Sequence, residues 1–288
     1  MIPGPFVYHR PKTLAEAGAL LAAHGDEARV IAGGHSLIPM MKLRMATPEH
    51  IVDIGAIAEL KGITHDSRLV TIGAMTTQAE LIASSDVTRT VPILREASLL
   101  IADPQVRYMG TLGGNIANGD PGNDMPAAMM VLGASYRLDG PAGSRRVPAR
   151  EFYLGAYATA LEPGEIVHSI EIPIPPAGHG YAYEKLKRKI GDYATAAAAV
   201  VLTLSRGKVA SAAIAVTNLA DISIFCEEAS RSVIGTTLDK AALATAASLA
   251  RKSMAPSEDA RGPVDYKAGV GGVIVARALE RAFARAGH

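Results

Sequence analysis

Apolar and polar positions along the first hundred residues alternate in short blocks, which predicts a mixed α+β domain. Residues 13–16, Thr-Leu-Ala-Glu, have the pattern of a capping box and open an Ala- and Leu-rich helix. Apolar runs at 29–32 and 50–54 are typical of strands, and residues 63–73 predict a hairpin. A further helix is predicted over residues 93–101.

Residues 103–124 break this pattern. The stretch holds five glycines and two prolines, and it has hardly any periodicity. We therefore expect one long loop, followed by a helix over 125–132. A loop of this length in a compact domain is usually functional or disordered, and its apolar residues, such as Leu112 and Ile116, argue against disorder.

A Pro- and Gly-rich stretch at 173–180 predicts a boundary near residue 177. The first domain, residues 1–177, is expected to be mixed α+β. The second domain, residues 178–288, begins with two strand-like segments around a turn at 205–208 and continues as Ala-rich helices.

Composition narrows the function classes. The chain has 288 residues, of which 49% are hydrophobic, a net charge of +1 and no Trp, so no basic or aromatic surface for nucleic acid is expected. One cysteine, Cys226, excludes a disulfide framework and an iron–sulfur cluster held by this chain alone.

The N-terminal residues lack the apolar region of a signal peptide, and the longest apolar run, near 194–204, is too short for a transmembrane span. The expected location is cytoplasmic.

Two glycine loops carry the candidate chemistry, Gly33-Gly34-His35-Ser36 and Thr111-Leu112-Gly113-Gly114-Asn115. Glycine allows successive backbone N–H groups to turn toward one point, and such a nest binds anions. Neutral donors from two distant loops would suit the diphosphate of a dinucleotide. Neither common phosphate motif, GxGxxG after a strand or GxxxxGK[ST], occurs, and each loop read alone is equally consistent with a simple turn.

The stretches 32–37 and 111–115 resemble the two FAD-binding signatures of the flavin subunits of molybdenum hydroxylases, the xanthine dehydrogenase family. The resemblance covers essentially the whole chain, and residues 178–203 resemble the carbon monoxide dehydrogenase branch. It implies a PCMH-type, vanillyl-alcohol-oxidase-like FAD-binding fold of two α/β subdomains. A C-terminal domain with an antiparallel sheet and a helix bundle would follow.

The resemblance also implies roles for single residues. Asp124, nine residues after Asn115, would hold the adenosine ribose; the alternatives are an Asx turn or a helix N-cap. Ile101 would pack near the flavin, and Tyr193 would stack on the isoalloxazine ring, although both also suit the core. The implied cofactor-binding residues are Ala32, Gly33, Gly34, His35, Ser36, Leu37, Ile101, Thr111, Leu112, Gly113, Gly114, Asn115, Asp124, Lys185, Lys187 and Tyr193.

Histidines and carboxylates indicate no metal site and no catalytic constellation. Some related oxidases link FAD covalently through a Gly-Gly-His stretch, but the resemblance implies noncovalent FAD, with His35 as a loop residue facing the diphosphate. Asp120 and Asp124 are separated by turn-forming residues, and the eight histidines are scattered without a metal-binding spacing.

The resemblance implies partners as well. In the family, a large subunit with the molybdenum cofactor oxidises CO, and a small subunit with [2Fe–2S] clusters passes electrons to FAD. This chain would pass them to an acceptor such as quinone, within a dimer of heterotrimers that is cytoplasmic or peripheral at the inner face of the membrane. Three alternatives remain open: the flavin subunit of a heterocycle or aldehyde hydroxylase, a self-sufficient flavoprotein oxidoreductase, and a binding module whose glycine loops are only turns.

Overall fold

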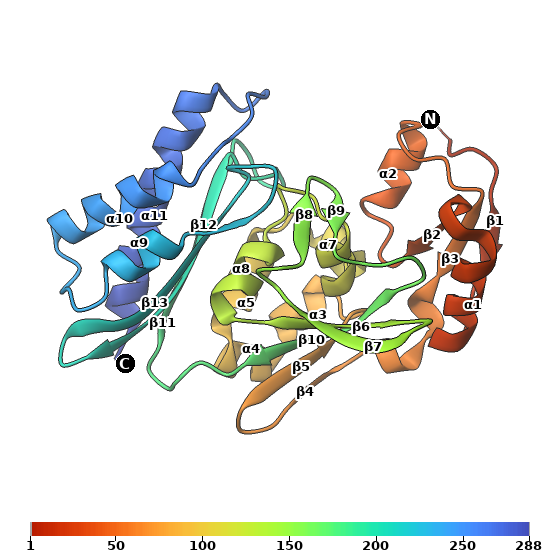
Figure 1. Ribbon diagram of the computed structural model, residues 1–288, viewed down its shortest axis with the longest axis horizontal. Helices are drawn as coiled ribbons and strands as arrows, with labels where there is room; N and C mark the ends of the chain where they lie inside the picture. The colour runs from red at the N-terminus through yellow and green to blue at the C-terminus, as the bar shows by residue number, and fades with distance from the viewer. Residues whose placement is uncertain (1, 288) are drawn as a thin grey trace.

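A three-stranded parallel sheet opens the chain in the computed structural model, which describes residues 2–287 (Figure 1). Its strand order is β1 (Val7–His9), β3 (His50–Asp53), β2 (Ala28–Ile31), and α1 (Leu14–His24) packs on it. Both strand predictions in this layer are confirmed. Thr13 caps α1 as expected, but the Glu16 carboxylate accepts the N–H of Lys12 rather than that of Thr13, so the capping box is only half formed.

The middle layer is a five-stranded antiparallel sheet. Its strands follow the order β4 (Ile63–His65), β5 (Leu69–Gly73), β10 (Ile166–Pro173), β6 (Ser135–Gly140) and β7 (Gly143–Pro148). The hairpin predicted at 63–73 is confirmed by the pairing of β4 with β5. Further elements before β11 in the chain are η1 (Gly25–Glu27), α2 (Leu37–Lys42), η2 (Ile54–Ala56), η3 (Ala58–Leu60), α3 (Gln78–Ala83), α4 (Ser85–Thr90), α5 (Pro92–Leu100), α8 (Met125–Leu132), β8 (Tyr153–Gly155) and β9 (Ala158–Thr159).

The prediction of one continuous loop over 103–124 is wrong. Two short helices, α6 (Pro104–Met109) and α7 (Leu112–Ala117), occupy it. Asp103 caps α6 by accepting the Val106 N–H, and Thr111 caps α7 by accepting the Gly114 N–H at 3.1 Å. Each helix has six residues, too few for a helical period to stand out. In α7 the cap offsets the low helix propensity of Gly113 and Gly114.

The C-terminal layer is an antiparallel sheet in the order β11 (Gly180–Leu186), β12 (Ala196–Ser205), β13 (Lys208–Thr217), β14 (Ile224–Phe225). Three helices cover one face: α9 (Glu227–Ser232), α10 (Lys240–Lys252) and α11 (Val264–Arg285). The predicted turn at 205–208 is confirmed by the pairing of Ser205 with Lys208. Four consecutive alanines, 196–199, are fully buried in β12, so small side chains let helices pack closely on both faces of that strand.

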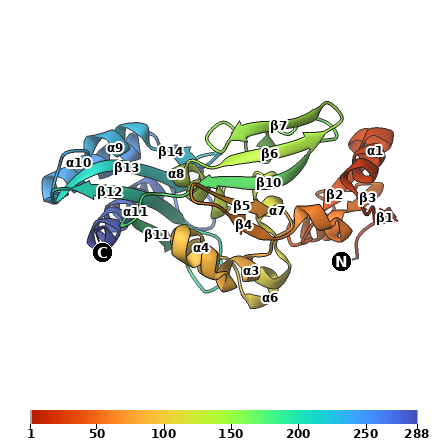
Figure 2. The ribbon, with the colours of Figure 1, turned by 90° about the horizontal axis from the view of Figure 1, so that it is seen from below.

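The three layers follow one another along the longest axis of the molecule (Figures 1 and 2). Helices α5 and α8 lie between the middle and C-terminal sheets. The core around them crosses the predicted boundary, because Tyr183 and Ala197 of the C-terminal sheet belong to the same buried cluster as Met129 of α8. The boundary near residue 177, between β10 and β11, stays a prediction. No helix within residues 2–287 combines the length and apolar character that a membrane crossing requires.

Candidate cofactor site

A cavity of about 1190 Å³ opens where the three layers meet. The loop between β2 and α2, the start of α7, the start of α8 and the end of β11 all contribute to its lining. The predicted cofactor residues that line it are Ala32, Gly33, Gly34, His35, Ser36, Leu37, Ile101, Thr111, Gly113, Gly114, Asn115, Asp124, Lys185 and Tyr193. Two predicted residues are not among the lining residues: Leu112, which is fully buried in the core, and Lys187.

The first glycine loop presents free backbone donors. Within residues 2–287, the N–H groups from Gly33 to Leu37 take part in no hydrogen bond. Gly34 has φ +73°, a conformation that favours glycine, and a side chain on Gly33 would overlap the Met109 carbonyl. The His35 ring is fixed by its own loop, because Nδ1–H donates to the Gly33 carbonyl at 2.8 Å. This geometry suits an anion held by neutral donors.

The second loop does not form the donor nest that its glycines predict. Its N–H groups from residue 112 to 115 are all used inside the protein: Leu112 and Gly113 donate to Thr76 and Ala74, while Gly114 and Asn115 donate to Thr111. Gly113 serves packing, since a side chain there would overlap Ala74. The loop therefore presents side chains, not N–H groups, to the cavity. Its Gly114 lies close to Ala32 of the first loop.

Two buried polar atoms at this cavity have no hydrogen-bond partner among the described residues, Asn115 Oδ1 and Gln78 Nε2. The other end of the Gln78 amide accepts the Ser98 hydroxyl at 2.9 Å, which fixes the side chain. Buried polar atoms are nearly always satisfied, so both point to a polar ligand. The sequence analysis did not single out Gln78, the first residue of α3 after its N-cap Thr77, because no motif marks it as a ligand-binding residue.

Asp124 is anchored by the C-terminal sheet. Its carboxylate accepts the Tyr183 hydroxyl at 2.6 Å and Lys185 Nζ at 2.8 Å, and Nζ also donates to the Leu100 carbonyl. Burial raises the pKa of Asp124, and the charge of Lys185 opposes that shift. The N-cap alternative is wrong in its chemistry: Asp124 stands at the N-cap position of α8 but makes no capping bond. Its role toward a ribose stays a prediction.

Lys185 and Lys187 differ in position. Lys185 lines the cavity with a side chain that is 1% exposed, whereas Lys187 is half-buried elsewhere. Burial, followed by the charge of Lys185, lowers the pKa of Lys187. Of the two candidates, Lys185 therefore faces the cofactor cavity.

Tyr193 lies at the edge of the cavity and is 45% exposed. It follows β11, so the alternative of a core-facing strand residue is wrong. Gly122 makes room for the ring, since a Cβ there would stand 2.8 Å from Tyr193 Cδ1. Next to it, Asp192 accepts bonds from Arg188 and Arg261, which fix the segment. Ile101 packs on the core, as expected, and it also lines the cavity; its place near the flavin stays a prediction.

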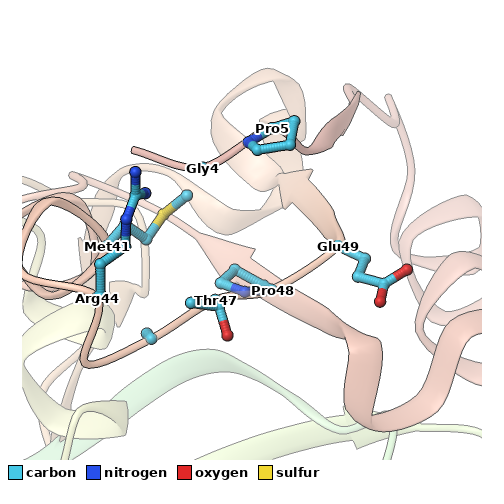
Figure 3. A pocket seen from close by; sticks show the side chains of 8 residues that line it. Gly4, Pro5, Met41, Arg44, Thr47, Pro48 and Glu49 are labelled. Atoms are coloured by element: carbon cyan, nitrogen blue, oxygen red, sulfur yellow. The ribbon is translucent and has the colours of Figure 1, made fainter. Parts of the chain in front are cut away.

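A second pocket, of about 320 Å³, lies between the N-terminal segment and the end of α2 (Figure 3). It is lined by Gly4, Pro5, Met41, Arg44, Ala46, Thr47, Pro48 and Glu49. It is much smaller than the first cavity and contains neither glycine loop. The larger cavity is therefore the candidate cofactor site.

The chain resembles known proteins along its whole length. Residues 4–175 match the family described as the FAD binding domain in molybdopterin dehydrogenase, and residues 181–282 match the carbon monoxide dehydrogenase flavoprotein C-terminal domain. The carbon monoxide dehydrogenase medium chain of Afipia carboxidovorans is 61% identical, with 99% of each chain covered. That of Hydrogenophaga pseudoflava is 49% identical, also with 99% of each covered. A chain in a crystal structure of cyanide-inactivated Cu,Mo-CO dehydrogenase superposes with a TM-score of 0.98 at 61% identity, covering 99% of this chain and 100% of that one.

Proposed function

Because the chain belongs to the family of FAD-binding domains of the molybdopterin dehydrogenases, we propose that it is the FAD-carrying medium subunit of a carbon monoxide dehydrogenase. The observation that carries the proposal is the cavity in which both glycine loops meet. The free N–H groups from Gly33 to Leu37 would hold the diphosphate. Asn115 and Gln78 offer further polar contacts to noncovalently bound FAD.

Bound FAD supplies reversible redox chemistry, and the protein supplies its position and electrostatic surroundings. Lys185 brings a buried ammonium group to the cavity, balanced by Asp124. Tyr193 covers the cavity edge and would limit access to the ring of the cofactor. Ile101 adds an apolar wall. These residues bind and shield the cofactor, and none of them is proposed as a catalytic residue.

The electrons must come from other subunits. The single cysteine, Cys226, is 2% exposed, and burial raises the pKa of its thiol to about 11, so it is neither a cluster ligand nor a reactive thiol. We place the [2Fe–2S] clusters in a small partner subunit and the molybdenum cofactor, where CO is oxidised, in a large one. The assembly is a dimer of such heterotrimers, cytoplasmic or peripheral at the inner face of the membrane, with quinone or another external acceptor.

Two other functions fit the site less well. A self-sufficient flavoprotein would need a free acid or base beside the flavin, but Asp124 and Lys185 are bonded to each other and buried. The flavin subunit of a heterocycle or aldehyde hydroxylase would use the same cavity. The 61% and 49% identities to carbon monoxide dehydrogenase chains favour CO as the substrate of the complex.

Purification of the chain from its native cells tests the proposal. We expect two co-purifying subunits, iron–sulfur and flavin absorbance, FAD released into the supernatant by acid precipitation, and CO-dependent reduction of a dye. Dye reduction by an aldehyde or heterocycle but not by CO would favour the other hydroxylases. A lone yellow chain would favour the self-sufficient enzyme, and flavin left in the pellet would indicate a covalent link, with His35 as the first candidate. A colourless chain without partners would refute the proposal.

A further inference from the structure

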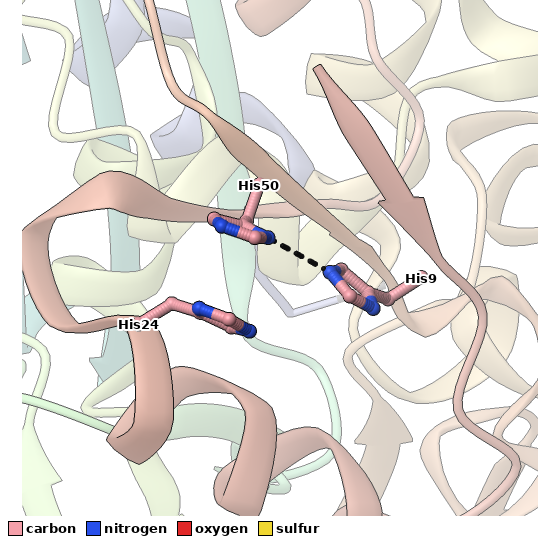
Figure 4. A group of neighbouring side chains, drawn as sticks. All are labelled: His9, His24 and His50. Atoms are coloured by element: carbon pink, nitrogen blue, oxygen red, sulfur yellow. Dashed lines mark hydrogen bonds between the residues drawn. The ribbon is translucent and has the colours of Figure 1, made fainter.

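Three histidines that are far apart in the sequence converge on the N-terminal sheet. His9 ends β1, His50 begins β3 and His24 ends α1 (Figure 4). The group is separate from the cofactor cavity, since none of the three lines it. In the sheet register, His50 pairs with Ala28 at the start of β2, whereas the glycine loop follows the opposite end of that strand.

The three side chains bring nitrogen atoms to one place. One ring nitrogen from each lies within 4.8 Å of the other two. His9 Nε2 and His50 Nδ1 are 3.0 Å apart, so one of these nitrogens donates a hydrogen bond and the other accepts it through its lone pair. The rings of His24 and His50 stack with centroids 3.6 Å apart. All three residues are half-buried, which leaves an ion a path from solvent.

No carboxylate competes for these three rings in the part of the chain that the structure describes, since none of the three takes part in an ion pair there. Each imidazole ring has a nitrogen that can donate a lone pair to a metal ion. Imidazole nitrogen is a preferred ligand of late first-row divalent ions.

We propose that His9, His24 and His50 form a binding site for a divalent transition-metal ion of the zinc class. Two nitrogens bound to tetrahedral zinc at about 2.0–2.1 Å are roughly 3.3 Å apart. The His9–His50 nitrogens are already close to that spacing. A metal lies in the plane of the imidazole that binds it, so the His24 ring turns out of its stack to complete the set. Solvent supplies the fourth ligand.

The ion would join three elements of the N-terminal layer: the edge strand β1, the last turn of α1 and the central strand β3. Val7 and Tyr8 of β1 are 52% and 54% exposed, so few apolar contacts hold this strand. An ion that binds only the folded layer stabilises it by mass action. The predicted role is thus a structural clamp on the layer that carries the first glycine loop.

The test uses the full-length chain with a histidine-free tag, treated with a chelator and dialysed against Zn²⁺, with bound zinc measured by mass spectrometry. We expect saturation at one zinc per chain, unaffected by excess Mg²⁺, which prefers oxygen ligands. His24→Leu and His50→Gln should each weaken binding by roughly tenfold or more. The matched control is His65→Gln, an exposed histidine of β4, and it should bind like the parent chain.

X-ray absorption of the zinc-loaded parent chain gives a readout that does not depend on variants. Three imidazole nitrogens in the first shell would support the site. A shell of oxygen atoms, absence of saturable binding, or equal affinity in His24→Leu and His50→Gln would overturn it. Circular dichroism of each variant distinguishes loss of the ligand from loss of the fold.

Discussion

Lys185 Nζ and the Asp124 carboxylate are 2.8 Å apart, with side chains only 1% and 6% exposed. The pair joins β11 of the C-terminal layer to the start of α8 at the wall of the cofactor cavity. The Tyr183 hydroxyl completes the arrangement by donating to the other carboxylate oxygen. The C-terminal layer therefore contributes directly to the electrostatics of a site whose glycine loops both come from the first 177 residues.

Lys185→Met should destabilise the chain strongly, because the substitution leaves the Asp124 carboxylate buried without its counterion. Breaking one partner of a buried pair costs about 3–5 kcal/mol of unfolding free energy. Urea unfolding measures this loss. Lys189→Met, at an exposed lysine nearby, should change stability by less than about 0.5 kcal/mol. The double variant Lys185→Met/Asp124→Asn should recover part of the loss, and equal stabilities of all variants would contradict the expected cost.

Gly114→Val should abolish retention of FAD. A Cβ at Gly114 would stand 2.8 Å from Thr111 Oγ1 and 3.5 Å from Ala32 Cβ, so valine would narrow the gap between the two loops. A tenfold drop in flavin content corresponds to about 1.4 kcal/mol of binding free energy, and we expect at least that drop. Flavin released by acid from the purified complex measures it.

The matched control is Gly18→Ala on α1, where an added Cβ meets nothing within 4 Å. It should keep its flavin and gain about 0.5–1 kcal/mol from helix propensity. Normal flavin content in Gly114→Val would exclude the assignment of this loop to the cofactor.

Tyr193→Ala should lower FAD occupancy severalfold and raise flavin fluorescence, because an aromatic contact worth about 0.5–1.5 kcal/mol is removed from the cavity edge. Fluorescence and flavin content of the purified complex report both effects. Tyr266→Ala, at a tyrosine of α11 with a similar exposure of 49%, serves as control. If both variants behave alike, Tyr193 has no special place beside the flavin.

Acid stability should depend on Arg145. Its guanidinium donates hydrogen bonds to both carboxylate oxygens of Glu165, at 2.6 and 2.8 Å. These bonds hold the pKa of Glu165 below its usual value of 4.5. A depressed pKa in the folded state stabilises the protein above about pH 4.5, and this contribution is lost as the pH falls through the folded-state pKa. In Arg145→Met, the free energy of unfolding should therefore decrease less than in the parent chain as the pH is lowered below about 5. Urea unfolding at successive pH values measures this decrease.

Arg146→Met is the comparison for this experiment. Arg146 is the next residue of β7 and also pairs with a glutamate, Glu171, but its side chain is 65% exposed. Exposed pairs contribute little, so its acid profile should follow that of the parent chain. Identical profiles for Arg145→Met and the parent would show that the Arg145–Glu165 bond does not carry the pH dependence.

Elements whose signals are local were predicted well. Thr13 marks the start of α1, and the turns at 66–67 and 205–208 mark two hairpins. The helices α6 and α7 were missed, because six residues are too few to show a helical period and the capping bonds of Asp103 and Thr111 are not apparent from composition. The donor nest predicted for the second loop was also wrong, since two of its N–H groups donate to Ala74 and Thr76 of another segment and two donate to Thr111.

Residue types and short spacings were enough to predict the α+β class, the two glycine loops and the absence of a cluster-binding cysteine set. They did not reveal which N–H donors remain free, that Asp124 accepts hydrogen bonds from Lys185 and Tyr183, or that His9, His24 and His50 meet. Such contacts join residues separated by 15 to 61 positions. They depend on how the sheets and helices pack, and no local pattern of side chains records that packing.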